Sequence, residues 1–198
     1  MYLDVPRIFY QLYMVYVIVQ DLIFPLVYVI CSRKDEATYT AIFQHVKESS
    51  QELGTEISPE YVMMDFELSG MNAVCAIFPN SVIKGCLFHF SQSIWRNVIN
   101  QGLKQQYDEN EHIRKDIRKL LALPFIPLHD LEETFDNLLD TIHDDVQDVA
   151  TYMETTYIRD RPARGRRRAI PPRFVPQIWN MYDLILNGIQ RTNRYVEG

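Results

Sequence analysis

Apolar residues are densest between residues 9 and 31, where Val, Ile, Tyr and Phe, the types that favour β-strands, predominate. Asp21 and Pro25 interrupt this stretch, and polar and proline residues between two apolar runs are typical of a turn. We therefore expect a buried hairpin with strands Phe9–Val19 and Leu26–Cys31. The interruptions also argue against a membrane span, which needs about 18 or more consecutive apolar residues.

The spacing of apolar positions becomes helical after this hairpin, and Gly54 stands where such a helix would stop. Pro59 then starts a new segment, in which Tyr61–Met64 predicts a short strand that leads into a helix ending near Ile77. The apolar positions of the first of these helices are Ala37, Ile42, Phe43, Val46 and Leu53.

A further strand and a further helix are predicted at Val82–Leu87 and Phe88–Gly102. The expected order over residues 1–102 is β-β-α-β-α-β-α, which is the pattern of an α/β core. The apolar face of the last of these helices consists of Phe88, Ile94, Trp95, Val98 and Ile99.

Residues 103–158 are acidic, and their apolar positions recur at helical spacing, which predicts an all-helical insertion. Residues 159–177 combine an arginine run with prolines, as in a basic connector, and residues 178–198 are predicted to form a last helix. The two apolar faces expected in the insertion are Ile113, Ile117, Leu120 and Leu121, and Leu131, Phe135, Leu138, Leu139 and Ile142.

The composition is that of a globular protein, because 47% hydrophobic residues are more than disordered chains carry. A chain of 198 residues suffices for one domain with an inserted subdomain. Three cysteines, Cys31, Cys75 and Cys86, are too few and too odd in number for a disulfide framework. We expect an intracellular, reducing location.

Asp65 directly follows a predicted strand, at the sheet edge where α/β proteins place ligand-binding side chains. The alternative is a helix N-cap, since Asp accepts hydrogen bonds from the free N–H groups of a first helical turn. Glu67 is expected to be a first-turn charge that the helix dipole favours.

Cys86 and His89 form a C-x2-H pattern, which is short enough for both side chains to approach one metal ion. A structural zinc site usually needs four ligands, and no second Cys/His pair is evident in the sequence. The alternative is that Cys86 is a small buried residue at the end of a strand, with a hydrogen-bonded His89 beside it.

The run from Tyr61 to Gln92 contains Asp-Phe-Glu after a strand, a helix, a Phe-Pro break and then Gly-Cys-x-x-His-x-x-Gln. This ordered set closely resembles the transposase domain of Mutator-like elements, the MULE family. Upstream, VPRIFYQLYMVYVI and FPLVYVICSRKDEATY resemble that family's second and third strands and the start of the next helix. Downstream, QRTNRYVEG resembles its Arg-Thr-Asn-Asn-x-x-Glu-Gly motif, with Arg194 in place of the second Asn.

The resemblance implies an RNase H-like mixed sheet flanked by helices, with an all-helical insertion before the last helix and a DDE triad of carboxylates. It maps the second catalytic, metal-binding acid onto Asp65 and the third onto Glu197, and it places Cys86, His89 and Gln92 in a motif near the site. The implied cofactor is Mg²⁺ or Mn²⁺, since hard cations prefer carboxylate oxygens. Two such ions about 4 Å apart can activate a hydroxyl and stabilise a leaving oxygen during DNA cleavage and strand transfer.

The family's first acid belongs to an Asp-Gly-Thr-Phe type motif that precedes the position of Val5 and Pro6. Asp4 lies too close to Pro6 to be that residue, so we expect the first strand and its aspartate to be missing. The resemblance therefore implies a transposase catalytic domain that is inactive by itself. We also expect self-association, because the absence of that strand would expose backbone groups and apolar side chains of its neighbour.

DNA is the partner that the resemblance implies, with a nuclear location and no membrane contact. The net charge of −6 excludes a generally basic surface, but a local arginine run can neutralise phosphates. A solvated linker and a nuclear localisation signal are equally compatible with such a run. Its arginines are Arg159, Arg161, Arg164, Arg166, Arg167 and Arg168.

Two other functions fit the same sequence. The chain could be a non-catalytic DNA- or protein-binding module derived from a transposase, or an unrelated interaction domain in which Asp65, Cys86, His89 and Glu197 are structural. A short distance between the carboxylates of Asp65 and Glu197 would favour a shared metal site over the unrelated domain.

Overall fold

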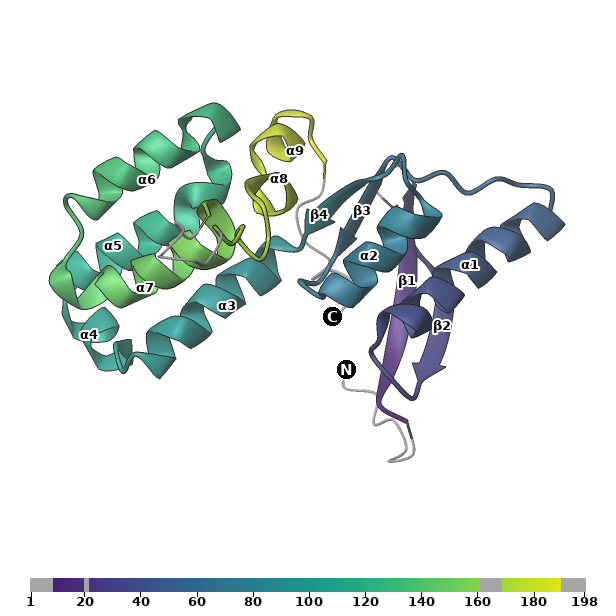
Figure 1. The fold of residues 1–198 in the computed structure, drawn as a ribbon, viewed down its shortest axis with the longest axis horizontal. Helices are drawn as coiled ribbons and strands as arrows, with labels where there is room; N and C mark the ends of the chain where they lie inside the picture. Colours follow the sequence, from purple (N-terminus) through teal and green to yellow (C-terminus); the bar gives the residue numbers. More distant parts are fainter. Residues whose placement is uncertain (1–8, 20–21, 161–168, 190–198) are drawn as a thin grey trace. The chain divides into compact units, whose positions relative to one another are not determined.

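The computed structural model describes residues 9–19, 22–160 and 169–189 of the chain. Its elements follow the order β1-β2-α1-β3-α2-β4-α3, and the described residues after α3 form helices and short helical turns (Figure 1). The predicted order of strands and helices is thus confirmed, and the fold is mixed α/β. The chain divides into two compact units, of which the first extends to Ile83 and the second begins at Lys84.

The first unit contains the hairpin, two helices and a second small sheet. Its elements are β1 (Gln11–Val19), β2 (Leu22–Cys31), α1 (Glu36–Glu52), β3 (Tyr61–Met64), α2 (Leu68–Ile77) and β4 (Val82–Gly85), the last of which extends across the division. The described strands form two sheets of two strands each, β1 with β2 and β3 with β4, and not one larger mixed sheet.

The hairpin pairs its strands antiparallel, from Gln11 opposite Cys31 to Val19 opposite Leu22. The sequence placed Pro25 in the turn, and this expectation is wrong, because β2 includes it. The register shifts by a bulge next to Tyr16, the residue opposite Pro25. A proline has no N–H to donate to a sheet, so a bulge is one of the few places where a strand accepts it.

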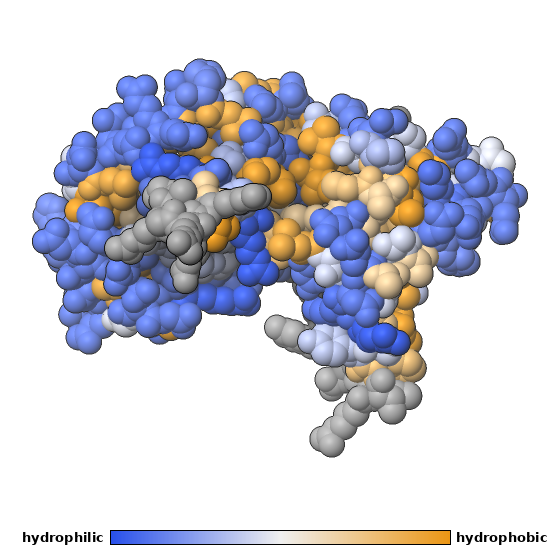
Figure 2. Space-filling model, viewed as in Figure 1, coloured by the Kyte–Doolittle hydropathy of each residue, from blue (hydrophilic) through white to orange (hydrophobic). Residues whose placement is uncertain are grey.

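One face of the hairpin packs on α1, and the other carries apolar side chains that the described residues leave partly exposed. On the packed face the ring of Tyr13 meets those of Tyr39 and Phe43, with centroids 5.1 and 6.3 Å away. Strands that are apolar on both faces are typical of the interior of larger sheets. Figure 2 shows hydrophobic residues on the surface along the hairpin. The exposed large hydrophobic residues on β2 are Leu22, Phe24, Leu26, Tyr28 and Ile30.

Helix α1 buries one stripe of side chains, which differs in part from the predicted one. The central positions Ile42, Phe43 and Val46 are confirmed, but Ala37 is exposed and Leu53 is 84% exposed. Leu53 is the C-cap of α1, and Gly54 beyond it has φ +73°, so the chain has already turned away from the core there. The buried stripe consists of Tyr39, Ile42, Phe43, Val46 and Ser50.

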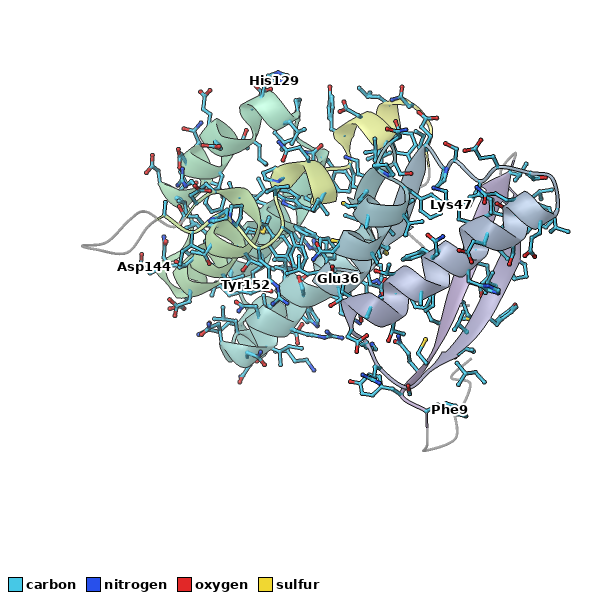
Figure 3. The ribbon with its side chains drawn as sticks, turned by 45° about the vertical axis from the view of Figure 1, so that its right-hand side comes forward. Phe9, Glu36, Lys47, His129, Asp144 and Tyr152 are labelled. Carbon is cyan, nitrogen blue, oxygen red and sulfur yellow. The ribbon has the colours of Figure 1, made fainter. Side chains whose placement is uncertain are left out.

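Two polar contacts fasten α1 to α2. At one end the Asn72 amide donates to Glu36 Oε2 at 2.8 Å, and further along Lys47 Nζ donates to the Ile77 carbonyl at 3.3 Å. Figure 3 labels Glu36 and Lys47, which lie well apart along α1. These contacts fix the direction of α2, whose N-terminus follows the Asp-Phe-Glu segment.

After β4, which ends at Gly85, the second unit consists of helices and helical turns joined by loops in its described residues, including residues 103–158, where the apolar spacing predicted helices. In Figure 1 the helices α3, α5, α6 and α7 run alongside one another. Within the part of the chain described, no helix is long and apolar enough to span a membrane. The α-helices of the second unit are α3 (Leu87–Asn100), α4 (Lys104–Glu109), α5 (Glu111–Ala122), α6 (Leu131–Leu139), α7 (Gln147–Met153), α8 (Pro176–Trp179) and α9 (Tyr182–Leu186).

An aromatic cluster forms the centre of the helical unit. The Trp179 ring stacks on Phe90 with centroids 5.2 Å apart and meets the edge of Tyr157 at 6.1 Å. Its indole N–H donates to the Tyr157 carbonyl at 2.7 Å, which satisfies the only polar atom of a fully buried side chain. The cluster thereby holds α8 against α3.

Lys84 is a buried cation that joins β4 to the segment around α8. Its Nζ donates to the carbonyls of Gln177 and Asn180 at 2.9 and 3.0 Å. Burial lowers the pKa of this ammonium, and the charge of Asp183 opposes that effect. The two carbonyls lie at the end of α8, where a cation is favoured by the helix dipole.

Asp116 is a buried carboxylate that ties two turns of the helical unit together. It accepts from Lys119 Nζ at 2.7 Å and from the His143 backbone N–H at 3.0 Å, and the residue is 6% exposed. Burial alone would raise its pKa, but these two hydrogen bonds outweigh burial and hold the pKa below the ordinary value of Asp. The ionised form is therefore favoured by folding.

Asp116→Asn is expected to destabilise the helical unit at pH 7 by about 1–3 kcal/mol, the usual effect of removing a buried charged partner. A lowered folded-state pKa adds stability that is full above the unfolded value near pH 4 and is lost as the pH falls through the folded value. The difference between the two proteins should therefore shrink below about pH 4. Urea unfolding followed by tryptophan fluorescence measures this difference in the free energy of unfolding, since Trp95 and Trp179 both lie in this unit. An equal difference at pH 3 and pH 7 would contradict the assignment.

Candidate active-site loop and the Cys-x-x-His helix

Asp65, Phe66 and Glu67 form the short connection between β3 and α2. Asp65 is half-buried, and its carbonyl accepts from the Glu67 backbone N–H at 2.7 Å. Glu67 is the N-cap residue of α2 but makes no capping hydrogen bond with its side chain. Asp65 is therefore not the N-cap of α2, so that alternative for Asp65 is wrong. Glu67 lies just before the first turn of α2, so the prediction that it is a first-turn charge is also wrong.

The side chain of Glu67 points into a network of polar groups from three other segments. Its Oε1 accepts from Lys34 Nζ at 3.0 Å, and its Oε2 accepts a short hydrogen bond from the hydroxyl of Tyr39. The Gln11 amide in turn donates to the Tyr39 hydroxyl at 3.1 Å. Glu67 thus links the loop after β3 to β1 and to α1.

Two tyrosines beside this loop have raised pKa values. Burial, followed by the hydrogen bond to the Glu67 carboxylate, raises the pKa of Tyr39. Burial, followed by the negative charges of Asp65 and Glu67, raises the pKa of Tyr13. Both phenols stay protonated at neutral pH, so Tyr39 is a donor to Glu67 throughout the physiological range.

Local sequence signals explain why Tyr39 arrives at this loop. Asp35 caps α1 and accepts from the backbone N–H of Thr38 at 2.9 Å, which starts the helix one turn before the tyrosine. In α2, Gly70 has no side chain, and a Cβ there would lie 2.8 Å from the end of Met64 and 3.8 Å from the Tyr39 ring. The absence of a side chain at Gly70 therefore lets α2 approach Tyr39 closely.

Cys86, His89 and Gln92 belong to the second unit, at the start of α3. Cys86 is fully buried and is the N-cap residue of α3. His89 is half-buried, with its ring 5.3 Å from that of Phe88 in an edge contact. Gln92 lies one turn further and accepts from Arg96 Nη2 at 2.6 Å. The predicted strand end at Leu87 is wrong, since β4 ends at Gly85 and α3 begins at Leu87.

Arg159 has internal partners in the helical unit. Its guanidinium contacts Asp136 Oδ1 at 2.7 Å and Glu154 Oε1 at 2.6 Å, and it lies over the Phe135 ring. The two carboxylates raise the pKa of Arg159 against the opposing effect of burial. This arginine holds α6 to the π-helical turn Glu154–Ile158. The prediction of nucleic-acid contact therefore depends mainly on the other arginines of the run, in residues 161–168.

Several predicted site residues lie outside the described residues. Glu197 is one, so its distance from Asp65 stays a prediction. The other arginines of the basic run are Arg161, Arg164, Arg166, Arg167 and Arg168, which also lie outside. Among the residues described, no three His, Cys, Asp or Glu side chains gather closely enough to hold a metal ion.

Sequence reasoning did not find the partners of Glu67. Tyr39 was not among the apolar positions predicted for α1, so neither its buried ring nor the role of its hydroxyl was anticipated. A buried tyrosine usually finds a hydrogen-bond partner, and that rule is the signal that could have identified it. Gln11 and Lys34 carried no signal, because their roles depend on how β1 and α1 meet the loop after β3.

The comparisons with known proteins address the same region of the chain. Residues 1–93 match the family model described as the MULE transposase domain. No curated protein and no solved structure matches the chain. The matched part includes the hairpin, the Asp-Phe-Glu loop and the Cys-x-x-His start of α3. Over residues 1–93, slightly less than half of its 198 residues, the chain is similar to the MULE transposase domain family.

Proposed function

We propose that this chain is part of the catalytic domain of a DNA transposase, in which Asp65 is a metal-binding acid of a DDE site on an RNase H-like sheet. The observation that carries the proposal is the position of Asp65 in the matched family domain, directly after β3 and before α2. In open α/β sheets this is the edge at which ligands bind.

The donor atoms that Asp65 offers suit a hard divalent cation. Asp65 is half-buried, so it is partly shielded from water. Mg²⁺ and Mn²⁺ prefer carboxylate oxygens, and Mg²⁺ usually keeps several waters beside one or two carboxylates. When bound, such an ion would supply Lewis-acid stabilisation of the oxygens at a scissile phosphate.

The remaining acids of the site follow from the family motifs. Glu197 corresponds to the third acid through the QRTNRYVEG segment, whereas the first acid has no counterpart by resemblance among these residues. A site with two of three carboxylates carries less negative charge and binds cations more weakly. We accordingly propose that these 198 residues alone bind Mn²⁺ weakly and do not transfer DNA strands.

Weak Mn²⁺ binding at Asp65 is best tested through paramagnetic broadening of backbone amide signals in ¹⁵N-labelled protein. Substoichiometric Mn²⁺ should broaden the amides of Asp65 and Phe66 first, and Asp65→Asn should remove that effect by deleting the charge at constant shape. The matched control is Asp144→Asn, an exposed aspartate of the helical unit that Figure 3 labels. Equal broadening in the Asp65→Asn protein would refute the proposed site.

DNA is the proposed substrate, and the nucleus is the proposed location. The arginines of residues 161–168 give a local positive charge in a chain whose net charge is −6. Each phosphate that a cation neutralises contributes about 0.9 to the slope of log affinity against log salt. Because Arg159 is held by Asp136 and Glu154, a test of this contact should leave it unchanged.

Replacing the five arginines of residues 161–168 by alanine should weaken binding to duplex DNA and reduce the salt slope, since their charges would no longer displace counterions. Replacement by five lysines is the matched control and should retain most of the slope. Fluorescence anisotropy with a labelled duplex over a range of NaCl concentrations measures both. An unchanged slope in the alanine protein would identify the run as a linker or a localisation signal.

A further inference from the structure

Glu67, the second carboxylate of the Asp-Phe-Glu segment, accepts hydrogen bonds from two other segments of the first unit. Both oxygens of Glu67 are engaged, one by Lys34 Nζ and the other by the Tyr39 hydroxyl. Tyr39 is 1% exposed, and Gln11 fixes its hydroxyl from the far side. Each carboxylate oxygen keeps a second lone pair after accepting one hydrogen bond. A metal cation at Oε1 of Glu67 would, however, meet the positive charge of Lys34 Nζ, which lies 3.0 Å from that oxygen.

The two contacts to Glu67 are not of equal strength. The side chains of Lys34 and Glu67 are 39% and 37% exposed, and ion pairs at such exposure contribute about 0–1 kcal/mol. The Tyr39 hydroxyl lies in the core and donates to a charged acceptor, and hydrogen bonds to charged groups are typically about twice as strong as neutral ones. Tyr39 is therefore the partner that determines where Glu67 lies.

The position of Glu67 is transmitted to Asp65 through the backbone. The Glu67 N–H donates to the Asp65 carbonyl at 2.7 Å, and the Glu67 carbonyl accepts from the Met71 N–H in α2 at 3.0 Å. The loop is thus fixed to α2 on one side and to Tyr39 on the other. Only one residue, Phe66, separates the anchored residue from the proposed metal ligand.

We propose that Glu67 is a positioning residue and not a metal ligand, and that Tyr39, supported by Gln11, holds it so that the Asp65 carboxylate is oriented for the cation. This inference rests on the proposed function, because it concerns the same site. It divides the motif into a residue that touches the metal and a residue that fixes the loop.

These different roles for Asp65 and Glu67 predict different effects on Mn²⁺ binding for variants of similar shape. Glu67→Gln keeps an oxygen that can accept from Tyr39, so it should retain the loop geometry and most of the Mn²⁺ broadening at Asp65. Glu67→Ala and Tyr39→Phe remove the bond and should weaken Mn²⁺ binding by about tenfold or more, because residues that orient metal ligands typically contribute about 10- to 100-fold.

The experiment is the Mn²⁺ titration of amide signals on the unchanged protein and on Tyr39→Phe, Glu67→Gln, Glu67→Ala and Asp65→Asn. Tyr157→Phe is the matched control for loss of a buried phenol, since its hydroxyl bonds to Ser93 at 2.7 Å in the helical unit. It should bind Mn²⁺ as the unchanged protein does. Amide hydrogen exchange without metal is the second readout, and Tyr39→Phe should accelerate exchange of the Glu67 N–H.

The outcomes separate the inference from the function on which it rests. Loss of binding in Glu67→Gln equal to that in Asp65→Asn would make Glu67 a ligand and overturn the inference while the metal site stands. Unchanged binding and exchange in Tyr39→Phe would also overturn it. If the unchanged protein and Asp65→Asn behave alike, the proposed metal site fails and the inference fails with it.

Discussion

The hydrogen bond from the Tyr39 hydroxyl to the Glu67 carboxylate is the contact on which the geometry of the matched domain depends. It joins the core stripe of α1 to the loop that leaves β3, and Gln11 extends the link to the hairpin. Removal of the Glu67 carboxylate would leave the buried Tyr39 hydroxyl without its acceptor, which costs more than an exposed bond contributes. The contact therefore fixes the loop that presents Asp65.

Packing around this contact explains the arrangement of the first unit. The ring of Tyr13 packs against those of Tyr39 and Phe43, and Gly70 allows α2 to approach Tyr39. The hairpin covers this core with one face only, and its other apolar face remains partly exposed in the described residues. In the helical unit, the Trp179 cluster and the Asp116 contacts provide an independent core.

The order of strands and helices could be predicted from hydrophobic periodicity, because each element of the core has a distinct apolar pattern. The bulge at Pro25 could not, since periodicity does not reveal that a proline is tolerated where the register shifts. Asp65 was singled out by its place after a strand, and it lies within the residues that match the family model. The role of Glu67 was missed because it depends on Tyr39, which is 28 residues away in sequence.

The proposed site requires that Asp65 binds the cation while the Tyr39 hydroxyl holds Glu67 in place. The most direct measurement is an anomalous difference map from crystals of the protein soaked in Mn²⁺. We expect a peak beside the Asp65 carboxylate, with Glu67 still bonded to the Tyr39 hydroxyl. A peak coordinated by Glu67, with the bond to Tyr39 broken, would contradict it.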